Sequence, residues 1–234
     1  MERLTSKTIK KIVYGTALSD AHVESRGRYQ LYSKNLEFVE YVASALNQIT
    51  GVNAKVSVRN DKRGYVGYTI NTNCHEYFKK IRKHTYKGRK FLSSYTVSRI
   101  DEVALSMIYM CDGYTEHSKN RQKGKVQNIG WLCLEAFPKE ELELLQAHLL
   151  KVWGVKSSLV KKPWGFGYRV RIGGESLQRF ISVIFPHMLD CFKYKTLLFY
   201  KEKKYVLELP NAEQYIHHYT CIEDIVRHPL KKGT

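Results

Sequence analysis

Apolar residues recur along this chain in two rhythms, one typical of amphipathic helices and one typical of strands. Four apolar residues at helical spacing predict a first helix over residues 7–19, with Thr5 or Ser6 as its cap. After it the pattern predicts, in order, a strand at 28–33, a helix at 36–49 that Asn35 caps and Gly51 ends, strands at 54–59 and 65–71 joined as a hairpin, and a helix at 74–84.

The second part of the chain repeats this order. A helix over 101–111 is expected to be capped from Ser98, with Asp101 three residues on. The predicted elements that follow are a strand at 127–135, a helix from Pro138 to about residue 152 that Gly154 ends, strands at 156–161 and 166–172, and a helix at 175–185.

The repeat predicts an α+β protein built from tandem, pseudo-twofold α-β-β-α-β-β-α units, although only three of the four strands in each unit are evident. Two like units usually pair about a twofold axis. We expect a first half at 1–85, a linker at 86–100, a second half at 101–196, and an extension at 197–234 that has no counterpart in the repeat.

Two of the apolar helices end on an aspartate, Asp20 in one half and Asp112 in the other. The C-terminus of a helix carries partial negative charge, so a carboxylate there costs about 0.3–1 kcal/mol. Two such residues on matching segments indicate carboxylates held for a ligand that offsets this cost, and a divalent cation is the obvious ligand.

These two segments resemble the LAGLIDADG motif of homing endonucleases, in the single-chain form with two motif copies, and the resemblance covers about residues 7–196. The first copy reads VYGTALSDA and the second LSMIYMCDG. Both copies keep the acid that binds metal in the family. Leu18, Ala21 and Met110 stand where the family often has its first acid or its last glycine.

The resemblance implies a monomer whose two antiparallel sheets form a DNA-binding saddle. It also implies Mg²⁺-dependent hydrolysis of double-stranded DNA at a long asymmetric target, leaving a staggered break. Asp20 and Asp112 would be catalytic and would share two or more Mg²⁺ ions. Lys90 and Lys195 match the basic residue that the family places near each metal centre, and Arg89 or Lys193 are the alternatives in these positions.

The charge of the chain is consistent with a polyanionic partner, since the net charge is +17 and the pI is about 9.6. In strand 54–59, Val56 and Val58 are expected to face the core. The side chains expected to face the DNA groove from the strands are Arg28, Gln30, Lys55, Ser57, Arg59, Arg169 and Arg171. The loop residues expected to contact phosphates are Lys62, Arg63, Lys119, Arg121, Lys123, Lys125, Lys161 and Lys162.

Other classes of protein are disfavoured. The chain has no apolar run long enough to span a bilayer and no signal-peptide core, so we expect an intracellular protein. Its five cysteines form no Cys-x-x-Cys pair, which indicates a reducing compartment. The alternative function is a non-cleaving nucleic-acid binder on the same fold, either an intron RNA maturase or a DNA-binding regulator. The presence of both aspartates favours the nuclease.

Overall fold

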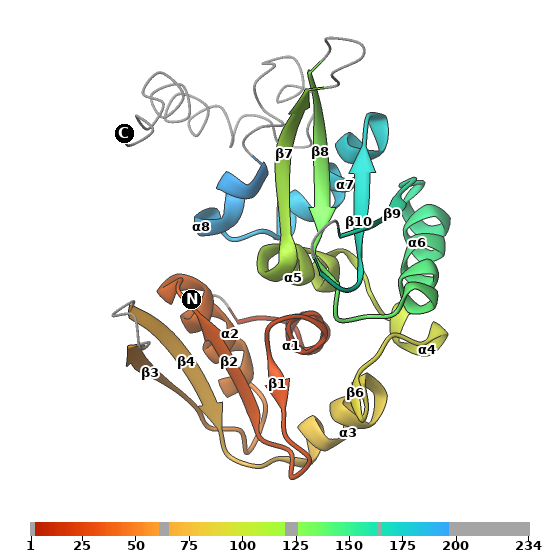
Figure 1. Cartoon of the computed structure of the whole chain (residues 1–234). Coiled ribbons are helices and arrows are strands. Elements are labelled where there is room, and N and C mark those ends of the chain that lie inside the picture. The colour runs from red at the N-terminus through yellow and green to blue at the C-terminus, as the bar shows by residue number, and fades with distance from the viewer. Residues whose placement is uncertain (1–2, 61–65, 120–125, 163–164, 197–234) are drawn as a thin grey trace.

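The computed structural model of the chain describes residues 3–60, 66–119, 126–162 and 165–196, and its layout is two four-stranded antiparallel sheets on either side of a central pair of helices (Figure 1). The first sheet has the order β1-β2-β4-β3 and the second has the order β7-β8-β10-β9. The matching orders confirm the predicted repeat and the α+β class.

The elements fall into two groups along the chain. Those of the first group are α1 Ser6–Leu18, β1 His22–Val23, β2 Tyr29–Ser33, α2 Leu36–Asn47, β3 Ala54–Asn60, β4 Val66–Thr72, α3 Glu76–Thr85, β5 Tyr86–Lys87, β6 Arg89–Lys90 and α4 Ser94–Val97. Those of the second group are α5 Glu102–Asp112, β7 Gly113–Lys119, β8 Val126–Leu132, α6 Lys139–Trp153, β9 Ser158–Lys161, β10 Tyr168–Gly173, α7 Glu175–Ile184, the 3-10 helix η1 Phe185–His187 and α8 Asp190–Lys193.

Helices α1 and α5 pack directly against each other and join the two halves in one continuous hydrophobic core. Gly15 makes this close approach available, because a Cβ at that position would lie 2.5 Å from the Ala104 carbonyl oxygen and 2.8 Å from the Met107 Cβ. Helix α2 packs on the first sheet, and α6 and α7 pack on the second. The core therefore lies between the helices and one face of each sheet, which leaves the other face uncovered by helix.

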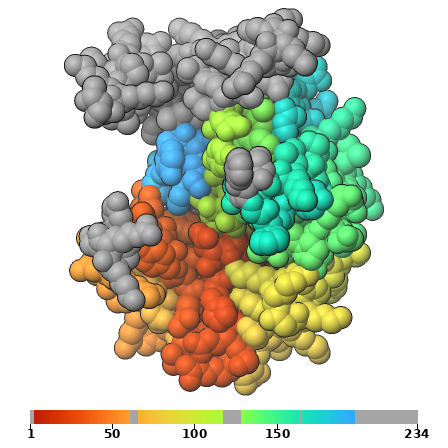
Figure 2. Space-filling model, viewed as in Figure 1, coloured from red at the N-terminus to blue at the C-terminus, as the bar shows by residue number. Residues whose placement is uncertain are grey.

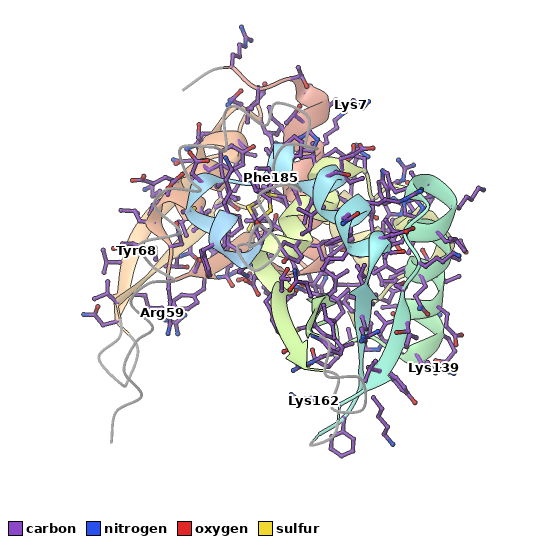
Figure 3. All side chains as sticks on the ribbon, turned by 90° about the horizontal axis from the view of Figure 1, so that it is seen from above. Lys7, Arg59, Tyr68, Lys139, Lys162 and Phe185 are labelled. Carbon is purple, nitrogen blue, oxygen red and sulfur yellow. The ribbon has the colours of Figure 1, made fainter. Side chains whose placement is uncertain are left out.

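The uncovered sheet faces open toward the same side of the molecule. Figure 3 shows Arg59 at the tip of β3 and Lys162 beyond the end of β9 on one side, while Lys7 in the first turn of α1 lies on the opposite side. This arrangement is the saddle that the resemblance implied.

Local signals predicted most of the helix ends. Asn35 caps α2 through its side chain, which accepts a hydrogen bond from the Phe38 amide. Gly154 ends α6 in the left-handed conformation (φ 65°). The predicted cap at Ser98 is wrong, because α5 begins one turn later with Asp101 as its cap. Ser98 instead ends the short helix α4, which the sequence analysis did not predict.

The fourth strand of each sheet is the element that directly follows the aspartate, β1 after Asp20 and β7 after Asp112. Strand β1 has only two residues and β7 is rich in polar residues, so neither produced a clear alternation. In both halves the chain passes from the end of a central helix straight into a sheet, which places the aspartate at the junction.

Val56 and Val58 lie on the predicted core face of the first sheet, but neither is buried there. Val56 pairs with the buried Ile70 and therefore lies on the core face of the sheet. Even so, Val56 is 39% exposed and Val58 is 66% exposed. Strand β3 is the edge strand, and it extends beyond the surface that α2 covers.

Within the described residues, no helix has both the length and the apolar character that crossing a membrane requires.

Candidate active site

Asp20 and Asp112 lie at the C-terminal ends of α1 and α5, where the two central helices meet. Asp112 is the last residue of α5, and Asp20 follows Ser19, the C-cap of α1. The Cys111 thiol of α5 is hydrogen-bonded to both Ser19 and Asp20 at the end of α1. Two carboxylates from distant parts of the sequence are thereby brought to one point on the interface.

The pKa values of the two carboxyls reflect this crowding. Burial raises the pKa of Asp112 to about 7, and the negative charge of Asp20 contributes to the rise. Burial also raises the pKa of Asp20, while its hydrogen bond with Cys111 lowers it. Asp20 keeps an exposed surface and Asp112 is half-buried, so the effect of burial on the carboxyl pKa is clearer for Asp112. Two like charges in a partly dry site favour a bound cation.

Lys90 and Lys195 lie at the ends of these same helices, one beside each motif. The Lys90 ammonium donates a hydrogen bond to the Ser19 carbonyl at the end of α1. The Lys195 ammonium donates to the Met110 carbonyl at 2.6 Å and contacts the Cys111 carbonyl at 3.4 Å. Helix C-termini attract cations, so both lysines are held by the helix ends that carry the aspartates.

The alternatives to these lysines point elsewhere. The Arg89 guanidinium forms an ion pair with Glu141 on α6, with 2.7 Å between Nη2 and Oε1. The Lys193 ammonium forms an ion pair with Asp190 at 2.5 Å. The geometry therefore places Lys90 and Lys195, rather than their neighbours, beside the two carboxylates.

The carboxylates suit a metal that needs few protein ligands. In the described part of the chain, neither Asp20 nor Asp112 has a basic group within the 4.0 Å that defines an ion pair. The described ranges also contain no cluster of three or more His, Cys, Asp or Glu side chains that could enclose an ion. Magnesium typically takes one or two carboxylates and completes its shell with water and phosphate oxygens. The donor set of two carboxylates fits Mg²⁺.

The uncovered face of the first sheet carries polar rows. Leu31 and Ile70 pair directly and are both buried, so the residues that alternate with them lie on the other face. Gln30 bonds to Asn71 at 3.2 Å, and Asn71 in turn pairs with Lys55. The expected groove residues Lys55, Ser57 and Arg59 are exposed.

Arg28 belongs to the same strand region and is half-buried. Its Nε atom is buried and finds no hydrogen-bond partner in the described part of the chain. A buried donor of this kind usually has a partner, and Arg28 is one of the residues expected to face DNA.

The second sheet differs because acids lie among its basic residues. Arg169 forms an ion pair with Glu135, which comes from the loop after β8, and Lys162 lies 3.9 Å from the same carboxylate. Trp131 donates its indole hydrogen to Glu116 at 2.9 Å. Neither acid was predicted from the sequence, because neither lies in a strand whose two faces could be assigned from its pattern. Arg171, on β10, is half-buried and pairs with Trp131 and Ser158 across the sheet.

The remaining expected phosphate contacts are mostly in loops. Lys161 ends β9 and is exposed. Lys119 ends β7, and its side chain is outside the described part of the structure, as are the residues Lys62, Arg63, Arg121, Lys123 and Lys125. Their contribution to binding stays a prediction.

Comparison with known proteins agrees with this geometry. The LAGLIDADG DNA endonuclease family matches this chain over residues 10–180, which is most of its length. The chain therefore belongs to the LAGLIDADG DNA endonuclease family, in its single-chain form with two motif copies. Among curated proteins, none matches the chain.

Solved structures share the fold. The homing endonuclease I-WcaI bound to its DNA recognition sequence is 20% identical, with a TM-score of 0.68 over 83% of this chain and 88% of that one. The meganuclease I-SmaMI bound to uncleavable DNA is 10% identical, with a TM-score of 0.54 over 96% and 98%. Full-length DUF199/WhiA from Thermatoga maritima is also 10% identical, with a TM-score of 0.51 over 97% and 69%. At these identities the likeness establishes the fold and not the activity.

Proposed function

We propose that this chain is a site-specific endonuclease that hydrolyses both strands of a long, asymmetric DNA target with Mg²⁺ and leaves a staggered break. The observation that supports it is the pair of aspartates, one from each half, at the junction of α1 and α5. The helices that carry them lie between the two sheets (Figure 1), and each aspartate is followed within two residues by a strand of one sheet. A protein that only bound DNA would gain nothing from clustered carboxylates beside phosphates.

In this proposal Asp20 and Asp112 hold two or more Mg²⁺ ions, which supply charge neutralisation and an activated water. The protein's own contribution is placement. The ends of α1 and α5 fix both carboxylates, and the Cys111 thiol orients the Asp20 carboxylate. Lys90 and Lys195 bring one ammonium to each side of the site, where each can orient water and stabilise phosphate charge.

We propose that the protein binds DNA as a monomer. The first half of the chain, residues 1–85, would contact one half of the target, and the second half, residues 101–196, would contact the other. The first sheet would read bases mainly through Gln30, Lys55 and Arg59, while loops contact phosphates. The exposed faces of the two sheets differ chemically, because the acids Glu116 and Glu135 bind side chains of the second sheet. This difference suits an asymmetric target.

The test uses Asp20→Asn and Asp112→Asn, with Glu40→Gln on the exposed side of α2 as a matched control. The substrate is either a DNA library or the genomic sequence that flanks the gene, joined as it would be without the gene inserted. Both Asn variants are expected to bind the target as tightly as wild type and to lose cleavage, while the control cuts normally. If purified wild type binds its target and leaves both strands intact in Mg²⁺, the nuclease proposal is wrong.

A non-cleaving DNA-binding regulator is the second candidate. The observation that favours it is the absence of the first acid from both motifs. Leu18 and Met110 occupy these positions and are almost fully buried. Apolar residues therefore stabilise the interface there without removing the metal-binding acids. Nothing in the described part of the structure favours intron RNA as a partner.

A further inference from the structure

Glu141 on α6 ties the part of the linker around Arg89 and Leu92 to the second half. Glu141, in the first turn of α6, accepts from Arg89 Nη2 at 2.7 Å and from Arg89 Nη1 at 3.3 Å. It also accepts from the Leu92 backbone amide at 2.8 Å. The Glu141 side chain is only 17% exposed. Two bonds from one guanidinium and a third from a backbone amide fix the relative position of the two segments more tightly than an ordinary surface ion pair does.

The opposite side of the same linker is tied to the first half. Tyr86, which pairs with Lys90 across the small β5–β6 hairpin, accepts a hydrogen bond from the Val23 amide at 3.3 Å. The Arg82 guanidinium lies over the Tyr86 ring, 4.3 Å from its centroid, and donates to the Val23 carbonyl. Figure 2 shows the yellow surface of the linker region in contact with the orange-red first half and the green second half.

Lys90 lies between these two attachments. Its neighbours in the sequence are fixed by hydrogen bonds. Glu141 binds Arg89 and Leu92, and the Phe91 amide donates to the carbonyl of Thr85, the last residue of α3, at 3.0 Å. Lys90 has a flexible four-carbon side chain, so its reach to Ser19 depends on where its backbone is fixed. We infer that Glu141 is a positioning residue, which acts through Arg89 and Leu92 to hold the Lys90 ammonium at the site.

The corresponding segment of the second half is held by different chemistry. Lys195 follows α8, whose Phe192 ring meets the Phe38 ring of α2 edge-on, with 5.2 Å between centroids. The Cys191 thiol lies beside Glu37 and Asn35 at the start of that helix. Each lysine segment is therefore supported by the first turn of a helix from the opposite half, by an ion pair for Lys90 and mainly by aromatic packing for Lys195. Loss of Glu141 should affect Lys90 alone.

This inference rests on the proposed nuclease function, and strand-specific cutting tests it. Each strand of the target is labelled, and Glu141→Ala is compared with Glu140→Ala, which removes an exposed acid from the same helical turn. Lys90→Gln identifies the strand that depends on Lys90. Glu141→Ala is expected to slow cutting of that strand about tenfold or more, because small misplacements of a catalytic group are costly. Supercoiled plasmid would then accumulate as nicked circles, while Glu140→Ala cuts like wild type.

A second measurement does not depend on cleavage. Limited acetylation followed by mass spectrometry reports how accessible the Lys90 amine is, with Lys195 as the internal reference. Glu141→Ala and the milder Glu141→Gln should raise acetylation of Lys90 several-fold and leave Lys195 and the melting temperature near wild type. Unchanged Lys90 labelling, or equal slowing of both strands, overturns the inference. A wild type that fails to cut overturns the proposed function, and the labelling still decides the role of Glu141.

Discussion

At the residue scale, the most informative feature is that both lysine ammonium groups bond to carbonyl oxygens and neither is paired with an aspartate. The carboxylate oxygens therefore stay available to a cation. The negative ends of α1 and α5 also hold the lysines near the proposed cation site without pairing them with its carboxylates.

The raised pKa of Asp112 predicts a dependence of stability on pH. Its carboxyl binds a proton more tightly in the folded than in the unfolded protein, because folding raises the pKa from the ordinary 3.8 to about 7. The free energy of unfolding of the metal-free protein should therefore fall as pH rises through this window, by at most about 1.4 kcal/mol per pH unit.

Asp112→Asn should remove this loss, so the variant is expected to gain stability over wild type between pH 5 and pH 8 in urea unfolding with EDTA. Added Mg²⁺ should stabilise wild type at pH 8 and should affect the variant much less. An equal difference between the two proteins at both pH values would contradict the assigned cause.

The Cys111 thiol gives a second prediction at this scale. Burial and the Asp20 charge raise its pKa, which keeps the unreactive thiol form. Cys74 is exposed. Among the four cysteines that the structure describes, alkylation followed by peptide mass spectrometry should label Cys74 first and Cys111 last in the native protein. Early labelling of Cys111 would show that the helix ends open in solution.

At the scale of elements, the α1–α5 contact determines whether the site exists. Gly15→Ala replaces a poor helix former with the best one, a gain of up to about 1 kcal/mol. The added Cβ would nevertheless meet Ala104 and Met107 at 2.5 Å and 2.8 Å.

We expect Gly15→Ala to destabilise the protein by about 1–3 kcal/mol, because overpacking of a tight interface outweighs helix propensity. Urea unfolding measures this, and cleavage should fall as well, since the aspartates move apart. Gly173→Ala is the control, because its Cβ would meet nothing closer than 3.7 Å. Equal stability of the two variants would show that α1 and α5 are less closely packed.

Some helix and strand boundaries could be predicted from the sequence and others could not. The start of α2 and the end of α6 were predicted because their signals are local, a capping side chain at Asn35 and a left-handed glycine at Gly154, whereas α2 ends at Asn47 and not at the predicted Gly51. Strand β1 has two residues, and its pairing with β2 is what defines it. No local pattern of that length separates a strand from a loop.

At the scale of the whole molecule, the net charge of +17 and the exposed basic side chains predict a strong dependence of DNA affinity on salt. The logarithm of the association constant should fall linearly with the logarithm of salt concentration. Lys55→Gln should reduce that slope by about one if Lys55 contacts one phosphate.

Lys7→Gln is the matched control, since Lys7 lies on the side of the molecule opposite Arg59 and Lys162 (Figure 3). Its slope should equal that of wild type in fluorescence anisotropy with labelled duplex. Equal effects of the two substitutions would place the DNA on a different surface.

The sequence alone determined the repeat, most of the helices and strands, the two aspartates and the family, because these depend on local periodicity and on motifs of a few residues. Tertiary structure decided which side chains meet. Asp20 and Asp112 are 92 residues apart in the chain (112 minus 20) and come together only through the packing of α1 on α5. Other contacts between distant elements direct the Arg89 side chain to Glu141 on α6, and the pairing of β8 with β10 brings Glu135 to Arg169. Contacts of this kind depend on the relative placement of distant elements, and no short stretch of sequence encodes that placement.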